Sequence, residues 1–404
     1  MNLSVIGQGY VGLTVAISAA ENGHTVMGFD LNKSLINDLS NGSSYVPSID
    51  ENRLLSLIKA GLYFPTTSEE NIQNSEVVII AVPTPLDSMR NPDLSYLEAA
   101  TKLIARNMKK SALIVNESTS YPGTLRNFIK PILDEGSNQK FLFAVAPERV
   151  DPGNFKWNIR NTPRVISGLS DEATSKAIAF YSTFCSSIYK APNPEVAEAS
   201  KLLENTFRQI NIALVNEFSE IANLIGFSAS EAVKAASTKP FGFMPFYPSI
   251  GVGGHCIPVD PNYLRYAARE FGSNTKFIEL ANQINLSMAK SVAIRIREHF
   301  NGELKDISIQ LAGIAYKPGV PDLRESPALL LMEELSKLGA KVSWCDPLVS
   351  EFNNSVGGPL DPNIDLGLVI TPQEGIDFSI WKKAGTKVFD LSPNEKFYGW
   401  PKYF

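Results

Sequence analysis

A predicted strand, a glycine-rich turn and a helix open the chain, and this arrangement constrains the fold more than any other feature. Residues 2–6 are apolar, residues 7–12 read Gly-Gln-Gly-Tyr-Val-Gly, and an alanine-rich helical segment continues to about residue 22. In such a turn the first glycine makes the bend, the second lets the backbone approach a pyrophosphate, and the third lets the helix pack on the strand. The pattern predicts a βαβ unit whose helix N-terminus faces phosphates.

An acidic residue ends the next predicted strand. Residues 25–30 read Thr-Val-Met-Gly-Phe-Asp. A carboxylate at Asp30 would accept hydrogen bonds from a ribose diol and would repel a 2′-phosphate, so the sequence predicts NAD rather than NADP as the cofactor. The competing interpretation is a plain turn followed by a surface aspartate.

Two series of strand-like segments indicate two α/β regions. The first continues at residues 76–82, 112–116 and 141–146, with further candidates at 164–168 and near Ile188. The second begins near Asp306, at residues 307–313, 341–345, 366–370 and 387–391. Strands that alternate with helices indicate parallel, doubly wound sheets. The predicted fold class is therefore α/β, with two Rossmann-like doubly wound domains joined by a central helical domain.

The region between the two series is predicted to be helical. Residues 195–225 have few helix breakers and carry apolar residues near helical spacing. A loop rich in glycine and proline follows at 240–261, and then more helix from about Pro261 to His299. We therefore expect three domains, at residues 1–190, 191–300 and 301–404, with a dimerisation surface on the long helix.

Composition excludes several classes of protein. The 404 residues include 37 Lys and Arg against 42 Asp and Glu, a net charge of −5 without a basic block, which disfavours nucleic-acid and membrane-surface binding. Three cysteines cannot form a disulfide framework, which favours a reducing cytoplasm. The uncharged run at residues 2–20 lacks a basic start and is broken by glycines, so it does not predict a signal peptide. Few histidines and no ligand spacing predict no metal site.

A cysteine lies on an unusual loop. Residues 251–261 read Gly-Val-Gly-Gly-His-Cys-Ile-Pro-Val-Asp-Pro. The glycines allow close approach of a ligand to the backbone, which makes Cys256 a candidate nucleophile if its surroundings favour the thiolate. The alternative is a buried structural thiol, and we assign Cys185 and Cys345 to that alternative.

Seven segments, in order along nearly the whole chain, resemble the UDP-glucose/GDP-mannose dehydrogenase family. They are residues 7–12, 82–85, 117–124, 146–149 and 201–205, the Cys256 loop, and residues 317–327. The resemblance is greatest to the branch that oxidises UDP-N-acetylhexosamines. It implies that the C-terminal domain binds a UDP-sugar.

The resemblance also implies an activity. The C6 alcohol of the sugar would be oxidised to a carboxylate with two NAD per turnover, through a Cys256 thiohemiacetal and thioester. Lys201 would stabilise the oxyanion, Asn205 would hold a water or alkoxide, and Asp260 would orient the Cys256 loop. Glu148 would assist hydrolysis as a base, and Thr119 would lie near the catalytic water.

Binding residues are implied in the same way. The alternatives are a solvated helix face for Lys201 and Asn205, a helix cap for Glu148, and a surface ion pair for Lys317 and Arg324. Cofactor contacts would come from Gly7, Gly9, Tyr10, Val11, Gly12, Asp30, Pro83, Thr84 and Arg324. Substrate contacts would come from Glu148, Arg149, Lys201, Asn205, Tyr247, Ser249, Gly251, Gly254 and Lys317.

The expected sugar depends on a few positions at which this chain differs from the family pattern. UDP-glucose members commonly carry lysine where this chain has Val259, so UDP-N-acetylglucosamine is expected first, then UDP-N-acetylmannosamine, then UDP-glucose. Where the family has a second carboxylate this chain has Pro152, so either Glu148 or Asp151 would assist hydrolysis. Competing hypotheses are a two-electron hydroxyacid dehydrogenase and a catalytically silent nucleotide-sugar sensor. We expect a homodimer or larger homo-oligomer, in a pathway of polysaccharide biosynthesis.

Overall fold

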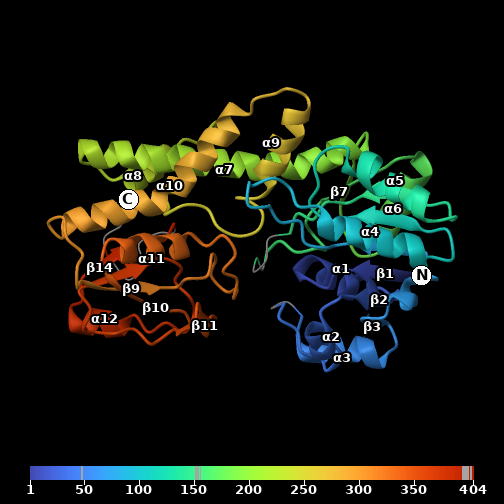
Figure 1. The fold of residues 1–404 in the computed structure, drawn as a ribbon, viewed down its shortest axis with the longest axis horizontal. Helices are drawn as coiled ribbons and strands as arrows, with labels where there is room; N and C mark the ends of the chain where they lie inside the picture. The colour runs from blue at the N-terminus through green and yellow to red at the C-terminus, as the bar shows by residue number, and fades with distance from the viewer. Residues whose placement is uncertain (47–48, 151–153, 155, 394–399, 401–402) are drawn as a thin grey trace. The chain divides into compact units, whose positions relative to one another are not determined.

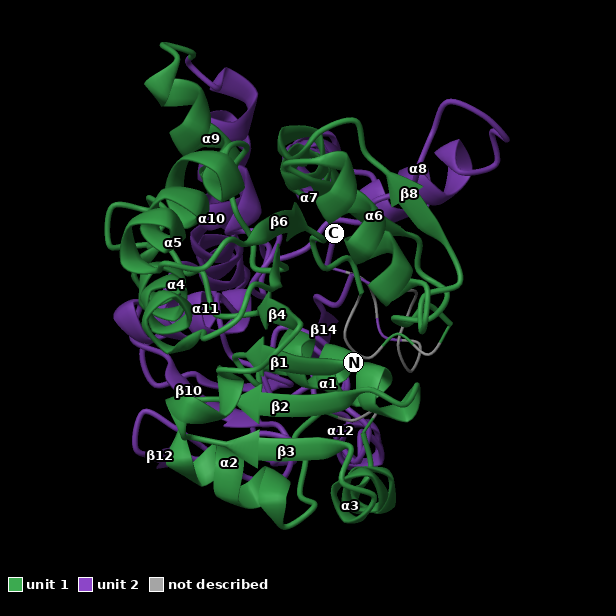
Figure 2. Cartoon of the chain, turned by 90° about the vertical axis from the view of Figure 1, so that its right-hand side faces the viewer, with its two compact units in different colours: residues 1–204, 262–273 green, residues 205–261, 274–404 purple. Residues whose placement is uncertain are grey.

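The computed structural model describes residues 1–46, 49–150, 154, 156–393, 400 and 403–404. They form two compact units, residues 1–204 with 262–273, and residues 205–261 with 274–404 (Figure 2). The long helix α7 (Pro194–Ile225) contributes residues to both units and confirms the predicted helix.

The first unit contains an eight-stranded sheet (Figure 1). Its strands are β1 (Asn2–Ile6), β2 (Thr25–Phe29), β3 (Tyr63–Thr66), β4 (Val77–Ile80), β5 (Leu113–Asn116), β6 (Leu142–Val145), β7 (Arg164–Gly168) and β8 (Ile188–Lys190). The order is β3-β2-β1-β4-β5-β6-β7-β8. Strands β1 to β6 are parallel to one another, as predicted, whereas β7 runs antiparallel to β6.

Helices cover both faces of this sheet because successive strand residues point to opposite sides. Val77 and Ile79 of β4 pack in one cluster with α1 (Tyr10–Glu21) and α6 (Asp171–Tyr181). Val78 and Ile80 pack in a second cluster with α4 (Ser95–Asn107), η2 (Leu125–Ile129) and α5 (Lys130–Gly136). The unit also contains α2 (Lys33–Ser40), α3 (Glu51–Lys59) and η1 (Glu69–Ile72).

The second unit repeats this design with a smaller sheet. Strands β9 (Ser308–Ala312), β10 (Lys341–Cys345), β13 (Leu366–Val369) and β14 (Val388–Asp390) are parallel, in the order β10-β9-β13-β14. Helices α10 (Lys276–His299) and α11 (Pro327–Lys337) cover one face, and α12 (Ser379–Ala384) packs Trp381 on the other. Helix α8 (Ala229–Ala236) and a hairpin of β11 (Glu351–Phe352) and β12 (Ser355–Val356) complete the unit.

One predicted helix is two helices. The segment expected to be continuous from about Pro261 to His299 divides into α9 (Asp260–Glu270) and α10. Gly272 follows α9 with a φ of +73°, the left-handed conformation that commonly ends a helix. Among the described residues, no helix is long and apolar enough to span a bilayer.

Candidate active site

The glycine turn after β1 is tight at its ends and open in its middle. Gly7 has a φ of +92°, and a Cβ there would lie 2.5 Å from the Ala81 carbonyl oxygen. A Cβ on Gly12 would lie 1.8 Å from the Gly7 oxygen, so both positions require glycine. A Cβ on Gly9 would meet only the Tyr45 hydroxyl, at 3.8 Å. The backbone at Gly9 is therefore accessible to a phosphate group at the start of α1.

Asp30 borders this turn. Its Oδ2 accepts the Gln8 N–H at 2.8 Å and its Oδ1 accepts the Asn32 N–H at 2.9 Å. The side chain remains partly exposed, and carboxylate oxygens have further lone pairs that could accept from a ribose diol. The position fits the role predicted for it.

Neighbouring strands end at the same edge. Strand β4 lies between β1 and β5 in the sheet, so the segments that follow these three parallel strands meet at the ligand-binding edge of the sheet. Pro83 is exposed there and Thr84 is buried. Ser118 joins two of these segments by donating its hydroxyl to the Val82 carbonyl at 2.9 Å.

The structure brings Lys201 and Thr119 together. Lys201 lies in the first turns of α7, and its Nζ donates to Thr119 Oγ1 at 2.7 Å. The lysine side chain is only 8% exposed, whereas Thr119 is partly exposed. An ammonium held in this way presents its charge at one fixed place.

Glu148, which follows β6, is buried and has several donors. Its Oε1 accepts the N–H groups of Arg149 and Val150 at 2.8 and 2.7 Å, and its Oε2 accepts from Arg164 Nη1 at 2.7 Å. Burial alone would raise the pKa of Glu148, but the Arg164 charge and these hydrogen bonds hold it below its ordinary value. Sequence reasoning missed Arg164.

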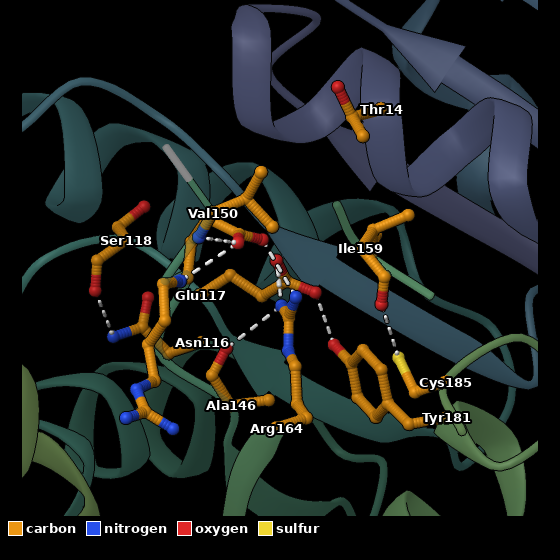
Figure 3. A network of polar contacts seen from close by, with 12 residues as sticks. Thr14, Asn116, Glu117, Ser118, Ala146, Val150, Ile159, Arg164, Tyr181 and Cys185 are labelled. Carbon is orange, nitrogen blue, oxygen red and sulfur yellow. Dashed lines mark hydrogen bonds and ion pairs between the residues drawn. The ribbon is translucent and has the colours of Figure 1, made fainter. Parts of the chain in front are cut away.

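Arg164 belongs to a larger buried cluster (Figure 3). Its guanidinium also forms an ion pair with Glu117, the residue after β5, and lies 4.8 Å from the centre of the Tyr181 ring. The Tyr181 hydroxyl donates to Glu117. Burial, opposed by the Arg164 charge, raises the pKa of Glu117 to about 7. The sequence contains one indication of this cluster, because charged residues stand directly beside its apolar strand segments.

Arg149, the residue after Glu148, is predicted to bind the substrate. Arg149 pairs with Glu204 of α7, with Nη2 and Oε1 2.7 Å apart, and donates from Nη1 to the Pro163 carbonyl at 2.8 Å. Asp151, the alternative to Glu148, and Pro152 lie outside the described residues.

In the second unit, Cys256 is exposed on a turn that leads into α9. Its carbonyl oxygen accepts the N–H groups of Val259 at 3.2 Å and Asp260 at 2.8 Å. Asp260 is 1% exposed, and its Oδ2 accepts from Asn205 Nδ2 at 2.7 Å. The cysteine turn is thus fixed to α7 through this hydrogen bond.

The loop before Cys256 packs against the segment that follows β9. The Gly254 N–H donates to the Arg324 carbonyl at 3.0 Å, and a Cβ on Gly254 would lie 2.6 Å from the Tyr316 ring. The Arg324 side chain bonds Asp322 at 2.6 Å. This bond, with a smaller contribution from Cys256, raises the pKa of Arg324. The positive charge of the guanidinium is therefore balanced by the Asp322 carboxylate.

Buried amides fix the remaining part of this loop. The Ser249 N–H donates to Asn216 Oδ1 at 2.8 Å, and Asn216 Nδ2 donates to Asn285 Oδ1 at 3.0 Å. The Ser249 hydroxyl donates to the Gly251 carbonyl at 2.8 Å. Tyr247 and Lys317 are partly exposed.

Three family models match successive parts of the chain. The NAD-binding domain of the UDP-glucose/GDP-mannose dehydrogenase family matches residues 1–208, its central domain matches 195–287, and its UDP-binding domain matches 310–372. The chain belongs to this family. It is an NAD-dependent UDP-sugar dehydrogenase, and the glycine turn with Asp30 fits NAD.

Relatives with different named substrates are similar over most of their length. A UDP-N-acetyl-D-mannosamine dehydrogenase of Pyrococcus horikoshii is 37% identical, over 88% of this chain and 86% of its own. A UDP-N-acetyl-D-glucosamine 6-dehydrogenase of Pseudomonas aeruginosa is 33% identical, over 87% and 83%. The solved structure of the P. horikoshii UDP-D-ManNAc dehydrogenase superposes with a TM-score of 0.88 at 33% identity, covering 99% of this chain and 98% of that one.

Proposed function

We propose that this dehydrogenase oxidises the C6 alcohol of a UDP-N-acetylhexosamine, with UDP-N-acetylglucosamine preferred, to the uronic acid through a thioester on Cys256. One observation carries the proposal. Cys256 is exposed on a glycine-rich turn that is fixed by the hydrogen bond of Asp260 to Asn205. An exposed cysteine sulfur can reach an aldehyde carbon, and its thiolate is the nucleophilic form.

The chemistry balances over two oxidations. When bound, NAD accepts a hydride from C6 in each oxidation, so two NAD are consumed. The first oxidation removes a hydride and a proton from the alcohol and gives an aldehyde. The Cys256 sulfur adds to the aldehyde carbon and restores a tetrahedral centre from which a second hydride can leave. Water then cleaves the resulting thioester, supplies the second oxygen and returns the thiol.

Lys201 and Asn205 would act on the developing charge. An ammonium held by Thr119 Oγ1 is already oriented, and such preorganised donors stabilise an oxyanion without a reorganisation cost. The Asn205 amide, whose Nδ2 is held by Asp260, would hold a water or alkoxide. Thr119 would lie near the attacking water.

Glu148 would assist hydrolysis by orienting that water. Three hydrogen bonds hold its carboxylate in one position and its pKa low, which weakens it as a proton acceptor. A fourth bond to water would still be within the capacity of a carboxylate.

The remaining residues would bind the two small molecules. For the cofactor these are Gly7, Gly9, Tyr10, Val11, Gly12, Asp30, Pro83, Thr84 and Arg324. For the UDP-sugar they are Glu148, Arg149, Lys201, Asn205, Tyr247, Ser249, Gly251, Gly254 and Lys317. We also propose the division into domains at residues 1–190, 191–300 and 301–404.

The preference for an N-acetylhexosamine is supported by Val259 and by the relatives, whose names include both N-acetylhexosamines. UDP-N-acetylmannosamine is the first alternative and UDP-glucose the second.

A homodimer through α7 forms part of the proposal. Five apolar side chains on one side of this helix are exposed: Leu203, Phe207, Leu214, Ile221 and Leu224. An exposed apolar stripe of this kind commonly marks an interface. We further propose a cytoplasmic enzyme, because three cysteines that form no disulfide suit a reducing compartment.

The test is the amount of NADH formed per sugar consumed. Wild type and Cys256→Ala would be assayed with the three UDP-sugars. Two NADH per sugar in wild type, with turnover abolished in the variant, supports the thioester route, and the ratio of kcat/KM values ranks the sugars. One NADH per sugar in both proteins would contradict it, and tight binding without any turnover would favour the sensor.

A further inference from the structure

A buried carboxylate on α7 lies next to the turn that carries Thr119. Glu198 precedes Lys201 by three residues, so the two side chains share a face of the helix. Both contact the turn that follows β5: Lys201 binds Thr119, and Glu198 binds residues 120–125.

Both oxygens of this carboxylate accept hydrogen bonds. Glu198 Oε2 accepts the Gly123 N–H at 2.6 Å, and Oε1 accepts the Leu125 N–H at 3.0 Å and the Ser120 hydroxyl at 3.3 Å. These N–H groups lie at the start of η2, where the backbone has unpaired donors and a positive dipole. A side chain from α7 thus provides the acceptors for this helix start.

Burying the Glu198 carboxylate costs stability, because its charged form is removed from water. Glu198 is 2% exposed, and the hydrogen bonds described above come from neutral donors. Burial, with a contribution from the charge of Glu195, raises the pKa of Glu198 to about 7 against the opposing hydrogen bonds. The charged groups that act on it are Glu195 and Arg126, which pair with each other at 2.7 Å, and the neutral phenol of Tyr121 also lies nearby.

We propose that Glu198 is a positioning residue, which fixes the turn at residues 118–125 to α7 so that Thr119 meets Lys201 in the arrangement needed for oxidation. The inference rests on the proposed function for its catalytic consequence, but its structural part stands alone. A glutamine at this position keeps the shape and offers an NH₂ group where Leu125 or Gly123 needs an acceptor. The turn then loses one of its two main-chain anchors.

The experiment compares Glu198→Gln with Glu195→Gln, the same change one turn earlier on a side chain that pairs with Arg126 instead. Hydrogen exchange by mass spectrometry reports the amides of Gly123 and Leu125 in the full chain. We expect exchange to be about tenfold faster or more in Glu198→Gln, as for the loss of a charge-assisted hydrogen bond. In Glu195→Gln it should be no faster than in wild type.

Kinetics provide the second measurement. Glu198→Gln should lower kcat for NADH formation by about tenfold or more, with both KM values within about threefold, because the transition-state arrangement is affected rather than binding. Glu195→Gln should retain the wild-type kcat. Wild-type exchange at Gly123 together with wild-type kcat in Glu198→Gln would overturn the proposal.

Wild type itself provides a test that does not depend on the variant folding. Exchange at Gly123 and Leu125, corrected for intrinsic rates, should become slower as the pH rises from 5.5 to 8.5, because ionised Glu198 is the better acceptor. Protection that does not change with pH would contradict the proposal. If wild type oxidises no sugar, the proposed function fails while the exchange results still decide this inference.

Discussion

The two α/β units contain the same glycine turn with a neighbouring aspartate, but the aspartate has different partners in each. In each, a glycine with positive φ follows the first strand, Gly7 at +92° and Gly313 at +82°. In each, an aspartate after the neighbouring strand accepts an N–H from that turn: Asp30 from Gln8, and Asp346 from Ile314 and Ala315.

The two aspartates differ in the number of N–H groups that they accept and in their exposure. Asp346 is 5% exposed and accepts three backbone N–H groups, the third from Leu348 at 3.0 Å. Asp30 accepts two and remains partly exposed. A shared turn geometry therefore does not imply a shared ligand: Asp346 stabilises its own loop, whereas the partly exposed Asp30 fits the ribose contact proposed for it.

The largest effect is expected from Gly313→Ala. Its Cβ would lie 1.7 Å from the Thr371 carbonyl oxygen at a φ of +82°, so we expect a loss of more than about 3 kcal/mol of stability or no folded protein. Gly319→Ala, with a φ of +77° and nothing within 4 Å, is the control and should lose about 1 kcal/mol. Equal denaturation midpoints for the two variants would refute the role of close packing.

Asp346→Asn should reduce stability without affecting the cofactor. An amide replaces one acceptor of a buried carboxylate that holds three N–H groups, at a cost of about 1–3 kcal/mol. Urea unfolding and the KM for NAD measure the two parts. A raised KM with normal stability would show that this aspartate serves NAD after all.

Asp30→Asn should have the opposite result. Its carbonyl oxygen can still accept from Gln8, so the unfolding midpoint should change little. Loss of the charged acceptor should raise the KM for NAD about tenfold, and the discrimination against NADP should weaken. Unchanged kinetics with both cofactors would remove Asp30 from the site.

The smallest effect is expected in the pH dependence of the stability of the first unit. The pKa of Glu117 is about 7 in the folded chain against an ordinary 4.5, so between these values the folded state binds the extra proton. Stability should therefore fall as the pH rises from 4.5 to 7, and Glu117→Gln should reduce this slope by about 1 kcal/mol per pH unit. Glu172→Gln, an exposed change on α6, should leave the slope intact.

Features encoded within one short segment were predictable from sequence. The glycine turn, Asp30 and the long helix each depend on neighbouring residues, and the family models confirm the assignment of the first domain to NAD. Strand β3, the antiparallel β7 and the partners of Glu148 depend on pairing between distant segments, such as Arg164 with Glu117. Glu198 had only one local signal, its spacing of three residues from Lys201.

The central claim, covalent catalysis by Cys256, is tested most directly by mass spectrometry of acid-quenched enzyme. Wild type mixed with NAD and excess UDP-N-acetylglucosamine would be quenched during the first turnover and digested. The account predicts an adduct on the Cys256 peptide with the mass of the substrate less four hydrogens, absent from Cys256→Ala. Full two-NADH turnover without any adduct, and undiminished in Cys256→Ala, would contradict it.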